Sequence, residues 1–238
     1  TIQIKMIPKT TFWILISCLI LLTLPIQGTE RIPQKIQNMD IKEHLGKNIP
    51  LDIAFTDQNG QKLTTGDIFN STIPIIINIA YYTCPKLCHL ITDSLTDSLN
   101  LSTLTLGKDY KILTMSIDPK DTHKTAKTYQ NKYINQLKKK TNNKQWIFVT
   151  TDKHNIDRMT QAVGFDYQYD KKTTEYLHGA TIIFTDNKGK ITRYLYGLNY
   201  SQNDLKLSIL ESKRNNTITT IERVILFCYN YNPSENSY

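Results

Sequence analysis

Two cysteines stand four residues apart in "YYTCPKLCHL", residues 81–90, directly after the apolar run "IPIIINIA". Pro85 suits the first position of a helix, because the N–H that proline lacks would have no partner there. On that helix Cys84 and Cys88 would share one face, with Cα atoms about 6 Å apart. The helix N-terminus would also favour the thiolate form of Cys84. The pair therefore predicts either thiol–disulfide chemistry or metal binding.

A metal site needs a third ligand, since two thiolates suit Cu(I) or Zn²⁺ but leave the coordination incomplete. His89 would point about 100° around the helix from Cys88, which is a poor direction for the same ion. His178, in "TTEYLHGA", falls in a predicted loop at the sheet end where the cysteines are expected. Spacing alone leaves His178 balanced between a ligand and an ordinary surface histidine. The remaining histidines are expected to be non-ligating: His44, His123 and His154.

Composition excludes some classes of protein. The chain has 238 residues and four cysteines, which are too few for a disulfide scaffold. The formal charge of +8 is spread along the chain, and the lysine cluster at residues 138–144 contains no aromatic residue that could stack on bases. We therefore expect no nucleic-acid binding. Cys228 is expected to be a small buried apolar residue.

The N-terminus predicts export. Residues 1–28 contain two lysines and then an apolar run over residues 12–26, which is typical of a signal peptide or an N-terminal membrane anchor. A lipoprotein box ending at Cys18 fits less well, because the apolar run continues beyond it. We expect the cell envelope, on the periplasmic side of the inner membrane, with the protein anchored or secreted. There a free dithiol would form a disulfide unless a reductant or a metal prevented it.

The rest of the chain divides into a linker (29–48), one globular domain (49–214) and a C-terminal extension (215–238). Within the domain, strand-like and helix-like segments alternate, which predicts parallel strands covered by helices, with antiparallel strands at the edges. The expected strands and hairpins are a hairpin at 49–65 about Asn59-Gly60, strands at 73–82, 110–118 and 145–150, and a hairpin at 180–197. The expected helices are 85–101, 125–137, 155–163 and 204–211.

These segments together resemble one known family. "YYTCPKLCHL" is similar to the C-P-x-x-C motif of the Sco/SenC family, copper-binding, thioredoxin-like proteins that assist assembly of cytochrome c oxidase. The likeness continues through "LTMSIDPKDT", "AVGFDYQYD", "EYLHGATIIFTDNKGKITRYLYG" and "ILFCYNYNP", over roughly residues 44–232. The resemblance, to the bacterial type, implies a thioredoxin-like three-layer α/β/α sandwich with a central mixed sheet and an added N-terminal β-hairpin.

The resemblance also implies the site. It places copper, as Cu(I) or Cu(II), on the thiolates of Cys84 and Cys88 and on His178. Asp118 in "SIDP" matches an aspartate of the family that would act on the site from behind the ligands, although a strand-end turn residue is an equal alternative. "SIDPKDT" is one residue shorter than the usual D-P-x-x-D-T, so Asp121 is predicted to be a helix N-cap rather than a ligand.

The implied function is that of a copper metallochaperone, not an enzyme, that helps to assemble the dicopper centre of cytochrome c oxidase. Its partners would be the copper-site subunit of the oxidase, together with a copper donor or a thiol reductant. The alternative is a thiol–disulfide oxidoreductase of the envelope that reduces the cysteines of the oxidase copper site. In that case Cys84 would attack and Cys88 would resolve. The pair has one more intervening residue than the C-x-x-C of thioredoxins, which makes general disulfide exchange the weaker hypothesis.

Overall fold

The computed structural model describes residues 41–83, 88–139 and 143–214. The predicted signal or anchor segment, residues 29–40 of the linker, the C-terminal extension, and Cys18, Cys84 and Cys228 lie outside these ranges. Cys88 is described by its backbone only. Within the described ranges, no helix has the length and apolar character needed to span a bilayer.

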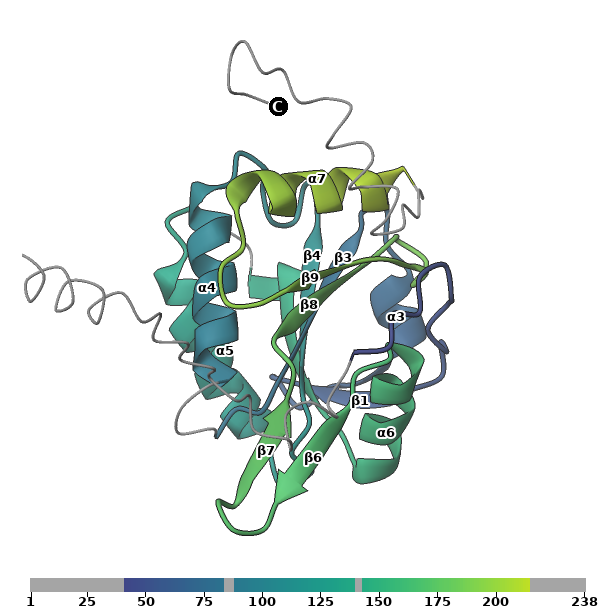
Figure 1. The fold of residues 1–238 in the computed structure, drawn as a ribbon, viewed down its shortest axis with the longest axis vertical. Coiled ribbons are helices and arrows are strands. Elements are labelled where there is room, and N and C mark those ends of the chain that lie inside the picture. The colour runs from purple at the N-terminus through teal and green to yellow at the C-terminus, as the bar shows by residue number, and fades with distance from the viewer. Residues whose placement is uncertain (1–40, 84–87, 140–142, 215–238) are drawn as a thin grey trace, which may run out of the picture. The chain divides into compact units, whose positions relative to one another are not determined.

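The centre of the fold is a seven-stranded mixed sheet with the order β2-β1-β5-β4-β3-β8-β9 (Figure 1). Strands β3, β4 and β5 are parallel, whereas β1 with β2 and β8 with β9 form antiparallel pairs at the two edges. The strands are β1 (Ala54–Asp57), β2 (Lys62–Thr64), β3 (Ile75–Ala80), β4 (Lys111–Ser116), β5 (Trp146–Thr150), β8 (Thr181–Thr185) and β9 (Ile191–Tyr196). Every residue of β3 is buried, as its apolar run predicts for a strand covered on both faces.

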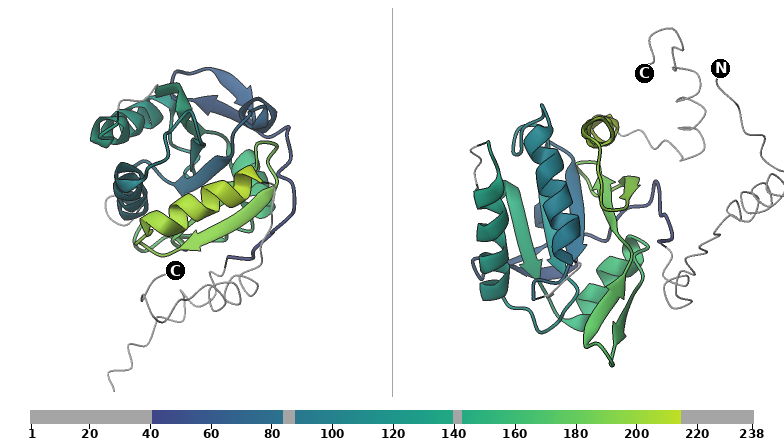
Figure 2. Two further views of the ribbon diagram at one scale, coloured as in Figure 1. Left: turned by 90° about the horizontal axis from the view of Figure 1, so that it is seen from above. Right: turned by 60° about the vertical axis from the view of Figure 1, so that its left-hand side comes forward.

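Helices cover both faces of this sheet (Figures 1 and 2). On one face lie α4 (Cys88–Leu101), α5 (His123–Gln136) and α7 (Gln202–Lys213), and their buried side chains share one hydrophobic cluster. On the other face lie α3 (Thr65–Phe69) and α6 (Lys153–Ala162), which share a second cluster. A single 3₁₀ turn, η1 (Asn143–Gln145), precedes β5. The expected three-layer α/β/α sandwich with its N-terminal hairpin is confirmed.

A small second sheet was not expected. Strands β6 (Tyr167–Asp170) and β7 (Glu175–His178) form an antiparallel hairpin, which projects at the bottom of Figure 1. The prediction that His178 lies in a loop is therefore wrong, because it is the last residue of β7. The alternation of aromatic and polar residues in "YQYD" is a period-two signal that could have revealed the first strand of the hairpin.

Candidate metal and thiol site

The end of β3 leads directly into the cysteine segment. The ladder between β3 and β4 closes with the Ile117 N–H donating to the Ala80 carbonyl at 2.8 Å, and Tyr81, Tyr82 and Thr83 follow. Both Tyr81 and Tyr82 are buried. The Tyr82 hydroxyl lies 2.8 Å from the carbonyl oxygens of Thr114 and Val149. These contacts fix the Tyr82 ring at the end of the sheet, two residues before Cys84. The geometry of Cys84 and of the Cys88 thiol stays a prediction.

Asp121 does not have the predicted role. The N-cap of α5 is Thr122, which forms a capping box with Thr125. The Asp121 carboxylate instead turns inward, where its Oδ2 accepts hydrogen bonds from the Tyr82 N–H at 2.8 Å and from the Ser116 hydroxyl at 2.6 Å. Burial raises the pKa of Asp121 above its usual value, and the two hydrogen bonds oppose that rise. The tight turn in "SIDPKDT" thus makes the next residue the cap and leaves this carboxylate against the backbone of Tyr82.

Asp118 follows β4 at the same end of the sheet and is half-buried. Its Oδ1 accepts a hydrogen bond from the Lys120 N–H at 2.9 Å, which is the turn role. The same oxygen lies 3.4 Å from the Tyr176 hydroxyl on β7. Asp118 therefore closes the turn and also contacts the strand that carries His178. Whether it influences a metal ion stays a prediction.

His178 is a half-buried side chain whose ring lies 5.5 Å from that of Phe165. Its Nδ1 lies 2.9 Å from the carbonyl oxygen of Gly179. Since a carbonyl only accepts, Nδ1 must carry the proton, and in the neutral ring Nε2 then carries the lone pair that could bind a metal. Burial lowers the pKa of His178, with the Gly179 hydrogen bond acting in the opposite direction, so the ring is neutral at pH 7.

The fold brings β7 next to the cysteine segment. The ring of Tyr176 meets that of Tyr81 edge-on, with centroids 5.3 Å apart. The antiparallel register of β3 and β8 ends with Asn78 paired to Ile182. The strand that carries His178 thus contacts Tyr81, three residues before Cys84, through Tyr176.

The other histidines have contacts or positions of their own. The ring of His89 stacks on Tyr129 with centroids 5.4 Å apart, and the Nδ1 of His44 donates to the Ala162 carbonyl at 2.9 Å. His123 begins α5 and His154 lies in the first turn of α6. Among the side chains that the structure describes, no three of His, Cys, Asp or Glu are grouped as a metal site, but neither cysteine thiol belongs to that set.

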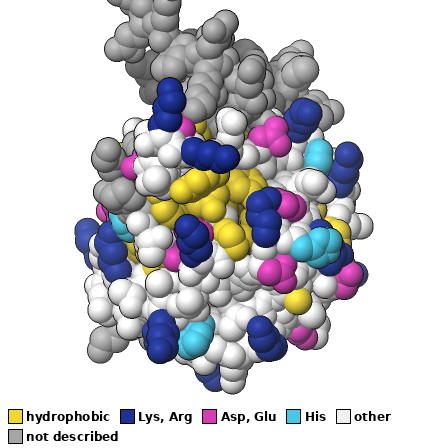
Figure 3. All heavy atoms as spheres, turned by 90° about the horizontal axis from the view of Figure 1, so that it is seen from below, with side chains coloured by type: hydrophobic (Ala, Val, Ile, Leu, Met, Phe, Trp, Pro, Cys, Tyr) yellow, Lys and Arg dark blue, Asp and Glu magenta, His cyan; other side chains and the backbone are white. Residues whose placement is uncertain are grey.

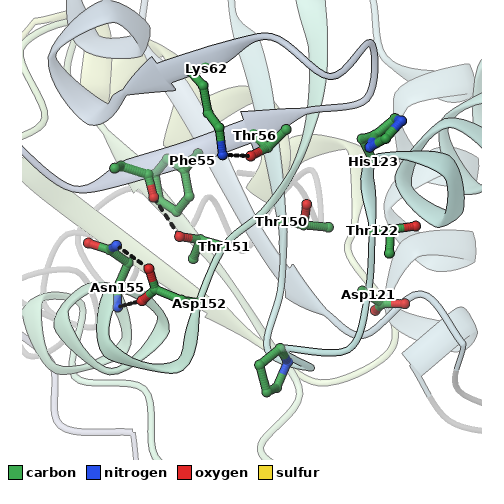
Figure 4. Close-up of a pocket in the computed structure, with 12 residues that line it drawn as sticks. Phe55, Thr56, Lys62, Asp121, Thr122, His123, Thr150, Thr151, Asp152 and Asn155 are labelled. Carbon is green, nitrogen blue, oxygen red and sulfur yellow. Dashed lines mark hydrogen bonds between the residues drawn. The ribbon is translucent and has the colours of Figure 1, made fainter.

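Two hollows lie at the carboxyl ends of the parallel strands. One, of about 360 Å³, lies between the first turn of α4 and the exposed side of α5, and Tyr82, Thr83 and His89 are among its lining residues. The other, of about 420 Å³, lies between β1 and the first turns of α5 and α6, with Asp121 at its edge (Figure 4). Seen from below, the end of the molecule that carries β6 and β7 shows a group of hydrophobic side chains surrounded mainly by lysine and arginine (Figure 3).

A parallel sheet core with antiparallel edges, and a helix that starts at a cysteine in the connection after β3, define a thioredoxin-like α/β protein. The SCO1/SenC family model matches residues 42–210, and the chain belongs to this family. No curated protein sequence matches the chain.

Several solved structures are similar to it. A protein of Aquifex aeolicus VF5 assigned to electron transfer has a TM-score of 0.63 and 25% identity, over 72% of this chain and 95% of that one. BsSco, a member of the Sco family of cytochrome c oxidase assembly proteins with a disulfide switch, has a TM-score of 0.56 and 16% identity, over 73% and 98%. ScoI of Bradyrhizobium japonicum, solved with copper bound, has a TM-score of 0.51 and 22% identity, over 69% and 99%. The last two likenesses show the shared fold.

Proposed function

We propose that this protein is a copper metallochaperone that binds copper through Cys84, Cys88 and His178 and delivers it to the dicopper centre of cytochrome c oxidase. The observation that carries the proposal is the position of β7, the strand that ends at His178, whose Tyr176 contacts Tyr81 three residues before Cys84. Family membership supports it, as do a related ScoI solved with copper and a related protein of oxidase assembly.

The chemistry of the ligand set fits copper. Two thiolates and one imidazole are soft and borderline donors that suit Cu(I), and an imidazole also helps to retain Cu(II). The Gly179 carbonyl orients the His178 ring and fixes its tautomer, as backbone acceptors commonly do for ligating histidines. Because burial keeps this ring neutral at pH 7, no proton has to leave before it binds a metal.

The remaining parts of the chain fit the same role. Residues 1–28 would direct the protein to the envelope, as a cleaved signal or as an anchor at the periplasmic side of the inner membrane, and residues 29–48 would link them to the domain at 49–214. The partner would be the copper-site subunit of the oxidase. The apolar group with its basic surround at the β6–β7 end offers a surface on which such a partner could dock (Figure 3).

The test is copper stoichiometry and affinity on the reduced full chain, with wild type, His178→Ala and the matched control His89→Ala compared. We expect one tightly bound copper in wild type and in His89→Ala. His178→Ala should weaken Cu(II) binding more than Cu(I) binding, because the two thiolates alone still hold Cu(I). If wild type bound no copper tightly while His178→Ala reduced a protein disulfide, the protein would be a thiol–disulfide oxidoreductase instead.

A further inference from the structure

A buried carboxylate lies under the segment that precedes the cysteines. Asp121 is 6% exposed and sits between the end of β4 and the start of α5. Among the described residues it takes part in no salt bridge. Its Oδ2 accepts two short hydrogen bonds, from the Tyr82 N–H and the Ser116 hydroxyl. A charge in such a place is costly to bury, so its two hydrogen bonds are the contacts that make it tolerable.

The backbone of Tyr82 lies where the sheet no longer holds the chain. The ladder of β3 and β4 ends with the bond from Ile117 to Ala80, so the N–H of Tyr82 has no strand partner in that ladder. The Asp121 carboxylate takes the place of that partner at 2.8 Å. Together with the two carbonyl oxygens that face the Tyr82 hydroxyl, it fixes both the backbone and the side chain of this residue.

A residue that only closed the turn would not need a buried carboxylate that accepts the N–H of Tyr82. Asp118, three residues earlier, closes the same turn from a half-buried position, and Thr122 caps the helix. Besides a hydrogen bond with Thr125 at the start of α5, the inward carboxylate of Asp121 accepts the N–H of Tyr82. It therefore connects the start of the helix to the chain leading to Cys84.

We propose that Asp121 is a positioning residue for the Cys84–Cys88 pair, because its carboxylate anchors the backbone at Tyr82 and so sets where Cys84 leaves the sheet. The expected effect of Asp121 on copper binding rests on the proposed function, whereas its expected effect on the pairing of the two thiols does not. An anchored approach keeps the thiols close together, which favours both a shared metal ion and the disulfide over two separate thiols.

The experiment compares four forms of the full chain. Asp121→Ala removes the acceptor, whereas Asp121→Asn keeps an amide oxygen that can accept both hydrogen bonds and removes only the charge. The matched control is Asp186→Ala, because Asp186 is 4% exposed and accepts the N–H groups of Lys188 and Lys190 at 2.8 Å. Asp186 follows β8 at the opposite end of the sheet, since Thr185 pairs with the first residue of β3.

Two readouts report on position without copper. In NMR spectra the Tyr82 amide of wild type should be slow to exchange and shifted downfield, and Asp121→Ala should remove both features. In the metal-free chain, the equilibrium of the Cys84–Cys88 disulfide with glutathione should move about tenfold toward the dithiol in Asp121→Ala. Asp121→Asn and Asp186→Ala should both stay within about threefold of wild type. Cu(I) affinity, measured separately, should fall about tenfold in Asp121→Ala only.

The outcomes separate this inference from the proposed function. If none of the four forms bound copper tightly but the glutathione equilibrium shifted as expected, the copper role would be refuted. Asp121 would then remain the positioning residue of a thiol pair. Equal behaviour of Asp121→Ala and Asp186→Ala in the glutathione equilibrium would overturn the inference. If Asp121→Ala does not fold, Asp121→Glu replaces it, because it keeps the charge but displaces the carboxylate. A glutathione equilibrium within threefold of wild type in Asp121→Glu would then refute positioning.

Discussion

The contact of Tyr176 with its neighbours predicts how the β6–β7 hairpin is held. Its ring lies 5.3 Å from Tyr81, 5.9 Å from Tyr167 and 5.0 Å from Tyr169, centroid to centroid. Each such aromatic pair contributes about 0.5–1.5 kcal/mol beyond the burial of its area. Tyr176 is half-buried, so we expect Tyr176→Ala to lower the free energy of unfolding by about 2–3 kcal/mol.

The hydroxyl of Tyr176 should matter much less. It lies 3.4 Å from Asp118 Oδ1, which is long for a bond between two oxygens, so Tyr176→Phe should cost less than about 1 kcal/mol. Urea unfolding of the metal-free chain measures both variants. Tyr169→Ala is the matched control, because Tyr169 is 42% exposed and contacts the Tyr176 ring, and we expect about 1 kcal/mol. Equal costs for Tyr176→Phe and Tyr176→Ala would refute packing as the main attachment.

Two further predictions concern the folded domain. Burial lowers the pKa of His178 below the usual histidine value of about 6.5. The unfolded chain therefore binds this proton more readily, so the stability from the neutral ring is complete above about pH 6.5 and is lost as the pH falls toward the folded pKa. The free energy of unfolding in urea, measured between pH 7.5 and 5, should depend less steeply on pH in His178→Gln, and an unchanged slope would contradict the assignment. Gly164 has a φ of +64°, and an added Cβ would lie 1.8 Å from the Lys42 carbonyl oxygen, whereas Gly197 has a φ of +90° and open space around it. Gly164→Ala should lower the free energy of unfolding by about 3 kcal/mol or more, and Gly197→Ala by about 1 kcal/mol, in thermal or urea unfolding. Similar losses in the two variants would show that the backbone at Lys42 moves away freely.

The main sheet and its helices could be predicted because their signals are local. The apolar run at 73–82 contains β3 (Ile75–Ala80), and the period of four in Ile91, Leu95 and Leu99 marks the buried face of α4. The turns at Gly60 and Gly189, with φ of +82° and +85°, match the two expected hairpins. Each of these features is decided by residues close together in the sequence.

What could not be predicted depends on contacts between distant residues. The hairpin of β6 and β7 is local, but it is separate from the main sheet, so its signal is the alternation in "YQYD" and not a run of buried apolar residues. Asp121 carries the sequence signature of a cap, but its carboxylate turns inward to the Ser116 hydroxyl and to the N–H of Tyr82, which is 39 residues away. His178 was identified through the resemblance, because spacing gives no measure of which strand ends meet.

The site is therefore assembled from parts that are anchored separately. The chain entering Cys84 is tied to the body of the domain through Asp121 and the carbonyls that face Tyr82. The strand carrying His178 is tied through the ring of Tyr176, which packs on Tyr81. Hydrogen bonds to a buried carboxylate are directional, whereas an edge-on ring contact tolerates small shifts. Under the proposed function, the histidine is then the ligand that can move while the thiols stay in place, and release of copper would begin at His178.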